Sequence, residues 1–179
     1  MHTSRVGRIL HWFIALLVLF QGLLGYSMLH VGWFREHLTT EILIHQQMGL
    51  LIFGLSLWML SIRLFKKARS GNGLNALNAR LAEAVHVLLY GLIFIQSAVG
   101  IWMMGLLGKG LWFFAWHVAL PIHPNPVLVF REVLPIHAAI AESLAGIIML
   151  HTVAALYHHF VLHDDVLRRM SPVNSSDKF

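Results

Sequence analysis

The chain has no cysteine among its 179 residues, and only 12% of them are charged. The absence of cysteine excludes disulfides, iron–sulfur clusters and thiolate catalysis. About a quarter of the residues in a soluble domain are charged, so the low charge argues against that class. Apolar residues make up 58% of the chain, which excludes disorder, and the length fits one domain spanning residues 1–179. Histidine is abundant instead, with 13 copies against eight acidic residues.

Four apolar stretches are long enough to cross a lipid bilayer, which takes about 20 residues. They are residues 9–30, 42–62, 81–107 and 136–162. The first is too long and too close to the start for a cleaved signal peptide, so we expect it to persist as a helix. The sequence therefore predicts an all-α fold, an integral membrane four-helix bundle in contact with membrane lipid.

The connecting segments differ in composition. Residues 69–78 read as a polar linker between the second and third helices, and the tail from residue 171 reads as a frayed end. Residues 108–135 are rich in tryptophan and proline. Because tryptophan favours the membrane–water interface, we expect a helix or loop in the headgroup layer there.

Basic residues are distributed unequally between the two sides of the predicted bundle. Ten fall on the side of the chain ends and the second connection, namely Arg5, Arg8, Arg63, Lys66, Lys67, Arg69, Arg80, Arg168, Arg169 and Lys178, and three on the other, namely Arg35, Lys109 and Arg131. Basic loops stay cytoplasmic, which predicts a multi-pass protein of the bacterial inner membrane with both termini in the cytoplasm. No basic stripe with interleaved aromatics is present, so we expect no nucleic-acid partner.

Ionisable side chains inside a bilayer are costly and usually functional. Five histidines fall in the apolar stretches: His11, His45, His86, His137 and His151. A single such histidine is often a hydrogen-bonding residue between helices. Several at matching depths fit that reading poorly, and metal binding explains them better.

His137 and His151 are fourteen residues apart on one predicted helix. This spacing returns to within about 40° of the same face after a rise of about 21 Å, so one imidazole lies near each side of the hydrocarbon layer. His45 enters the second helix level with His137. His11 enters the first helix level with His151, and His86 lies at the same depth, so geometry alone does not choose between them.

Two layers of two histidines fit two six-coordinate haems better than a zinc site, which needs three or four protein ligands together. Gly49, one turn after His45, is expected to leave room for the macrocycle. Glu142 lies between the two histidines of the fourth helix. It could accept the ring proton of a ligand histidine, conduct protons or be buried in its neutral form, and we favour the last of these.

The residues that carry this pattern resemble the bacterial cytochrome b561 family. They are the run LHW at residues 10–12, His45 with Gly49, the spacing of His137 and His151, and the closing run HHFVLHDDVLRRM at 158–170. The resemblance covers essentially the whole chain. It implies a four-helix bundle with two b haems, in which His11 pairs with His151 on the cytoplasmic side and His45 with His137 on the periplasmic side.

The resemblance also implies an activity. Some members of this family are superoxide oxidases, which pass electrons from superoxide to ubiquinone, and others are known as electron carriers. We therefore expect a di-haem oxidoreductase of the superoxide:ubiquinone type that moves single electrons between a periplasmic donor and membrane ubiquinone. His158, Arg63 and His86 reach the inner depth expected for a quinone head and are the candidate quinone-site residues.

Two other functions compete with this one. A cytochrome b subunit would need a protein redox partner, a dehydrogenase or reductase, docked on the outer segment. A histidine-lined metal transporter would need acidic ligands in the spans or a broken helix, and only Glu83 and Glu142 are available. Haem content and superoxide turnover by the purified chain separate these readings.

Overall fold

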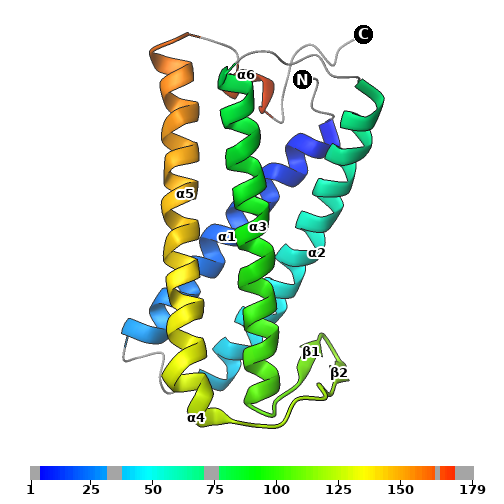
Figure 1. Cartoon of the computed structure of the whole chain (residues 1–179), viewed down its shortest axis with the longest axis vertical. Helices are drawn as coiled ribbons and strands as arrows, with labels where there is room; N and C mark the ends of the chain where they lie inside the picture. Colours follow the sequence, from blue (N-terminus) through cyan, green and yellow to red (C-terminus); the bar gives the residue numbers. More distant parts are fainter. Residues whose placement is uncertain (1–4, 32–37, 71–76, 164–165, 172–179) are drawn as a thin grey trace.

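A computed structural model describes residues 5–31, 38–70, 77–163 and 166–171. Four long helices run along its long axis (Figure 1): α1 (Arg5–His30), α2 (Leu38–Ser70), α3 (Leu77–Leu106) and α5 (Leu134–Phe160). Each includes a segment long and apolar enough to cross a membrane. The predicted all-α membrane bundle is therefore confirmed.

The helix ends differ from the apolar runs that we used to predict them. The second run was expected to end at residue 62, whereas α2 continues through basic sequence to Ser70. Helical hydrogen bonding does not require an apolar environment, and the chain has no glycine or proline between Ile62 and Gly71. Residues 71–76 of the expected linker, and the tail from residue 172, lie outside the described residues.

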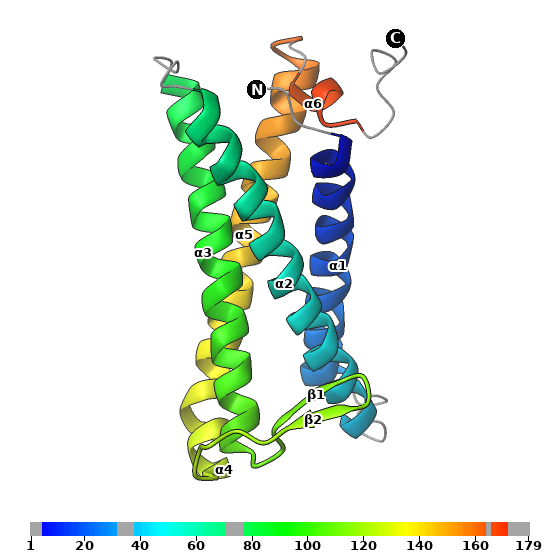
Figure 2. The same cartoon turned by 90° about the vertical axis from the view of Figure 1, so that its right-hand side faces the viewer.

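The two ends of the bundle carry different features (Figures 1 and 2). At one end, which we call the basic end, lie the first turn of α1, the last turns of α2 and α5, and the short α6 (Val166–Arg169). The opposite end, which we call the hairpin end, carries β1 (Leu111–Phe113) and β2 (Trp116–Val118). The indole nitrogen of Trp12 donates a 2.8 Å hydrogen bond to the carbonyl of Met170, which fastens the segment after α6 to α1.

The hairpin is a feature that the sequence analysis did not predict, since we expected a helix or loop for residues 108–135. β1 and β2 are antiparallel and lie across the end of the bundle (Figure 2). Phe114 at the tip has a φ of 53°, a conformation that is uncommon for a bulky residue. Gly110 has a φ of 63°, and a Cβ there would lie 2.7 Å from the carbonyl oxygen of Val118, so glycine is required.

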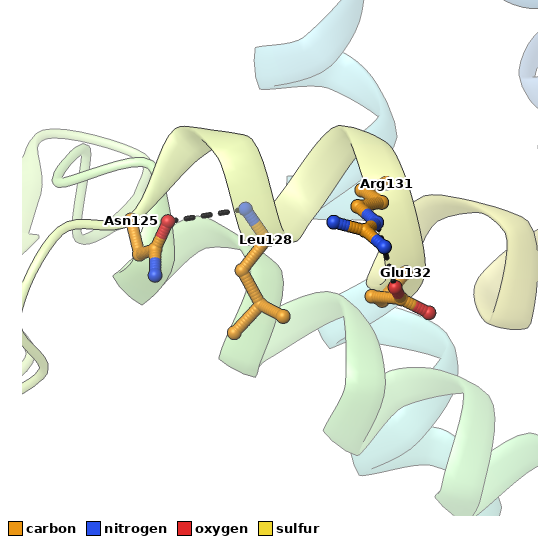
Figure 3. Close-up of polar contacts among 4 residues, drawn as sticks. All are labelled: Asn125, Leu128, Arg131 and Glu132. Atoms are coloured by element: carbon orange, nitrogen blue, oxygen red, sulfur yellow. Dashed lines mark hydrogen bonds and ion pairs between the residues drawn. The ribbon is translucent and has the colours of Figure 1, made fainter.

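After the hairpin the chain becomes helical earlier than the predicted residue 136. Asn125 caps α4 (Pro126–Leu128) by accepting a 3.1 Å hydrogen bond from the Leu128 amide (Figure 3). A π-helical segment, η2 (Val129–Val133), then leads directly into α5. Pro135 lacks an amide hydrogen, and a local widening of the helix tolerates that missing donor.

The hairpin end has a small core of its own. Val129 and Val133 are 1% exposed and pack with Leu106 of α3. An ion pair of 3.2 Å joins the exposed side chains of Arg131 and Glu132 on the outside of η2 (Figure 3). The packed valines fix the start of α5 against the end of α3, and so position the first imidazole on α5.

Candidate functional site

The structure brings four of the predicted histidines together as two pairs. His45 of α2 faces His137 of α5 with 6.3 Å between the ring centroids and 70° between the ring planes. His11 of α1 faces His151 of α5 at the same 6.3 Å, with 54° between the planes. One helix, α5, therefore supplies one imidazole to each pair, at two levels about 21 Å apart.

This ring spacing suits a metal ion held between two imidazoles. An imidazole nitrogen lies about 2.0 Å from its metal, and the ring centroid lies about 1.1 Å behind the nitrogen, so two opposed ligands put their centroids about 6.3 Å apart. The Nδ1 atoms of His11, His45 and His137 are buried without a hydrogen-bond partner among the described residues. Buried polar atoms usually have a partner, yet no hydrogen bond to Nδ1 from the described residues fixes these three rings.

The described residues contain no group of three or more His, Asp or Glu side chains arranged to hold a metal ion. Two imidazoles at each level therefore need further ligands from elsewhere. The four nitrogens of a haem macrocycle complete such a site, and a bare zinc site is not supported.

His86 of α3 also lies beside His151, with 5.2 Å between the ring centroids and 78° between the planes. This spacing is about 1 Å shorter than an intervening metal ion requires. The Nδ1 atom of His86 donates a hydrogen bond to the carbonyl of Ala82, one turn earlier in α3. His86 therefore packs edge-on against His151 and is oriented by its own helix.

Glycines of neighbouring helices lie close to the imidazoles. A Cβ at Gly25 would lie 3.2 Å from Cε1 of His45, and one at Gly100 would lie 3.4 Å from Cε1 of His137. At Gly49, where we expected room for the macrocycle, the nearest atom is the amide nitrogen of Gln21, at 3.3 Å from an added Cβ. That amide donates a 2.8 Å hydrogen bond to the carbonyl of His45.

The sequence analysis missed Gly25 and Gly100 because glycine is common in membrane helices. A glycine beside a cofactor ligand has the same sequence signal as one that faces lipid, and Gly22 and Gly91 have open space around an added Cβ. Only the helix packing distinguishes these positions.

The candidate quinone residues lie toward the basic end. Arg63 of α2 is hydrogen-bonded to the hydroxyl of Tyr90 on α3, and it also lies near His86. The sequence analysis did not predict a role for Tyr90, because a tyrosine in an apolar helix usually only packs against its neighbours. His158 lies two turns beyond His151 on α5 and is half-buried.

The structure corrects the expectation for Glu142, whose side chain is exposed on α5 and not buried. Glu142 is five positions after His137, and five positions at 100° each turn its side chain about 140° away from the imidazole. The sequence spacing therefore predicted the depth of Glu142 in the membrane but not the helix face on which it lies.

The hairpin is connected to the pair that lies nearest to it. The Gln46 amide nitrogen donates a 3.1 Å hydrogen bond to the carbonyl of Trp112 in β1. Gln46 directly follows His45, so the hairpin is fixed beside this histidine level. Phe114 and Trp116 are 77% and 78% exposed.

Comparison with known proteins identifies the family of this chain. The model of the prokaryotic cytochrome b561 family matches residues 2–172. Cytochrome b561 homolog 1 of Escherichia coli is 28% identical over 175 residues, which cover 91% of this chain and 93% of that protein. The family implies b-type haem and electron transfer in a multi-pass bacterial membrane protein. The chain, with its four apolar helices and paired imidazoles, therefore belongs to the prokaryotic cytochrome b561 family.

Proposed function

We propose that the chain binds two b haems and transfers single electrons from a periplasmic donor, superoxide in the most specific form, to membrane ubiquinone. His11 and His151 would hold one haem, and His45 and His137 the other. The observation that carries the proposal is the recurrence of one imidazole spacing, 6.3 Å, at two levels of α5. Family membership supports the b-type haem and electron transfer.

When bound, haem supplies one-electron redox chemistry. The role of this chain is to hold the imidazoles in opposed pairs, which leaves no coordination position for a substrate. Electrons would then pass by outer-sphere transfer, without coordination of superoxide or quinone. Burial among the apolar helices and the hydrogen bonds around each imidazole would set the two potentials.

The basic end offers proton donors for a quinone head. Reduction of a quinone to a quinol takes up two electrons and two protons, so the head must be held near acidic hydrogens. The Arg63 guanidinium donates to the Tyr90 hydroxyl, which leaves the hydroxyl proton of Tyr90 free to be donated to a quinone carbonyl. His158 would serve as a further donor at this end, whereas a neutral His86, whose Nδ1 hydrogen is bonded to the Ala82 carbonyl, would present Nε2 as an acceptor.

The charge distribution supports an orientation for the protein. Basic residues gather at the basic end, and the hairpin end carries few of them. Since positive loops are retained in the cytoplasm, the basic end and both termini would be cytoplasmic. The hairpin and the His45–His137 pair would then lie toward the periplasm, where superoxide or another donor would deliver electrons.

The test is haem content and turnover of the purified chain. We expect close to two b haems per chain and superoxide consumption that depends on added ubiquinone. Replacement of His151 or His137 by alanine should remove one haem, whereas His123→Ala, at an exposed histidine of the hairpin end, should remove none. A colourless protein, or two haems retained after His151→Ala, would contradict the proposal.

A partner-dependent electron carrier is the second candidate. The exposed aromatic side chains of Phe114 and Trp116 favour it, because such residues are frequent in protein interfaces. This candidate predicts full haem content without superoxide turnover until a dehydrogenase or reductase is added. The metal transporter gains no support, since the described residues hold no cluster of three metal-ligating side chains.

A further inference from the structure

Helices α1 and α3 share one spacing of three residue types. Each helix has a histidine, a glutamine ten positions later and a glycine four positions after the glutamine. The triplets are His11, Gln21 and Gly25 in α1, and His86, Gln96 and Gly100 in α3. Both helices run from the basic end to the hairpin end. Each glutamine therefore lies about 15 Å beyond its histidine and about 6 Å short of its glycine.

The two glycines lie against the two imidazoles of the His45–His137 pair, which we call the hairpin-end pair. A Cβ at Gly25 would lie 3.2 Å from Cε1 and 3.8 Å from Nδ1 of His45, and a Cβ at Gly100 would lie 3.4 Å from Cε1 of His137. One ring of the pair is thus next to α1 and the other is next to α3. Each glutamine is one helical turn from this contact, on nearly the same face of its helix.

Both glutamines have a buried side-chain oxygen that accepts no hydrogen bond from the described residues. Gln21 already reaches α2 at this level, because its Nε2 atom donates a 2.8 Å hydrogen bond to the carbonyl of His45. That bond uses the nitrogen of the amide and leaves its oxygen unpaired beside the same residue. The oxygen of Gln96 is unpaired in the same way on α3.

The imidazoles of the hairpin-end pair have the complementary need. The Nδ1 atoms of His45 and His137 are buried, and neither is hydrogen-bonded to a described residue. A histidine that binds a metal through Nε2 carries its hydrogen on Nδ1 and almost always donates it to an oxygen. Pairing each Nδ1 with a glutamine oxygen would remove the cost of an unpaired buried group at both ends of the bond.

We propose that Gln21 and Gln96 are positioning residues for the haem of the hairpin-end pair, whose side-chain oxygens accept the Nδ1 hydrogens of His45 and His137. This inference rests on the proposed binding of haem. Such an acceptor fixes the rotation of the ring and makes the imidazole a more basic ligand. A more basic ligand favours oxidised iron, so the two amides would lower the potential of this haem.

Gln96 provides the cleaner test of the two glutamines. On α2, Glu41 and Gln46 also have an unpaired buried oxygen, and both are close to His45 in the sequence. Among the described residues of α3 and α5, the Gln96 oxygen is the only buried side-chain oxygen without a partner. Loss of the Gln96 oxygen therefore leaves His137 with no substitute of this kind on either helix.

The experiment is a redox titration of the purified full chain, followed by haem absorbance. Gln96→Leu should raise the midpoint potential of one haem, the one that His137→Ala removes, by about 59 mV. This value corresponds to a tenfold change in the ratio of reduced to oxidised iron at a fixed applied potential. The haem of His11 and His151, about 15 Å from Gln96, should keep its potential and serves as the internal reference.

Three further variants separate the acceptor from the bulk of the side chain. Gln96→Met has a similar length without an oxygen and should give the same rise, whereas Gln96→Glu keeps an acceptor and should give none. Ser97→Ala is the matched control on α3, because its hydroxyl donates to the carbonyl of Ile93 in its own helix. It should leave both potentials unchanged.

The outcomes distinguish this inference from the proposed function. Two bound haems with unchanged potentials in Gln96→Leu and Gln96→Met would overturn the inference alone, as would an equal rise in Ser97→Ala. If both variants lose the haem of the hairpin-end pair, its retention in Gln96→Glu supports the acceptor role, and its loss there overturns that role. A wild-type chain that binds no haem would contradict the proposed function instead.

Discussion

With two haems bound as we propose, the contact between Gly25 and His45 predicts that a larger side chain in α1 will remove one haem and leave the other. A Cβ at position 25 would lie 3.2 Å from Cε1 of His45. Non-bonded carbons rest about 3.5–4.0 Å apart, so Gly25→Ala already pushes the ring by a few tenths of an ångström. Gly25→Leu places further carbons about 1.5 Å beyond Cβ and should move the ring by about 1 Å or more.

A shift of that size is large against the 6.3 Å spacing of His45 and His137. Overpacking of this kind costs about 1–3 kcal/mol, equivalent to about a 5- to 150-fold loss of affinity at the hairpin-end pair. We expect Gly25→Leu to lower the haem content from about two to about one per chain, measured from the pyridine haemochrome spectrum and the protein concentration. Gly25→Ala should give an intermediate or unchanged value.

Gly22→Leu is the matched control, because a Cβ at Gly22 has no atom within 4 Å and lies on the same helix. It should keep both haems. If Gly25→Leu also keeps both with an unchanged spectrum, then the approach of α1 does not limit the position of His45, and our account of this pair is wrong.

Further predictions concern the basic end and the hairpin. His86→Ala should keep two haems, because the ring of His86 is too close to His151 to share a metal with it. His11→Ala should keep one. The number of haems per chain distinguishes the two variants. Tyr90→Phe should lower the rate of quinone reduction severalfold at constant haem content, since it removes the hydroxyl proton, and an unchanged rate would exclude Tyr90 from the quinone site. Gly110→Ala should destabilise the hairpin by about 1–2 kcal/mol, because a Cβ meets a backbone carbonyl at a positive φ, and faster proteolysis within residues 108–120 would show it.

The helices and the histidine levels could be predicted because they depend on local sequence. Apolar runs of sufficient length specify membrane helices, and α-helical geometry alone places His137 and His151 on one face of α5. The choice between His11 and His86 could not be made in this way. Both lie at one depth, and their distances from His151 depend on how α1 and α3 pack.

The errors have a common physical origin in tertiary contacts. The β-hairpin has only three residues in each strand. Its tip requires a positive φ at Phe114, a residue type that does not indicate a turn. The approach of the Gln21 amide from α1 to Gly49 was likewise not visible in the sequence. Glu142 was expected inside the bundle, and helix rotation places it outside.

Because α5 contributes an imidazole to both pairs, one continuous run of hydrogen-bonded backbone determines the separation of the two levels. An inserted residue between positions 137 and 151 would rotate everything beyond it by about 100° and break one pair. Insertions in the connections at either end of the bundle escape this constraint. Among descendants of this chain, length variation should therefore collect in the connecting loops, while the fourteen-residue interval in α5 stays fixed.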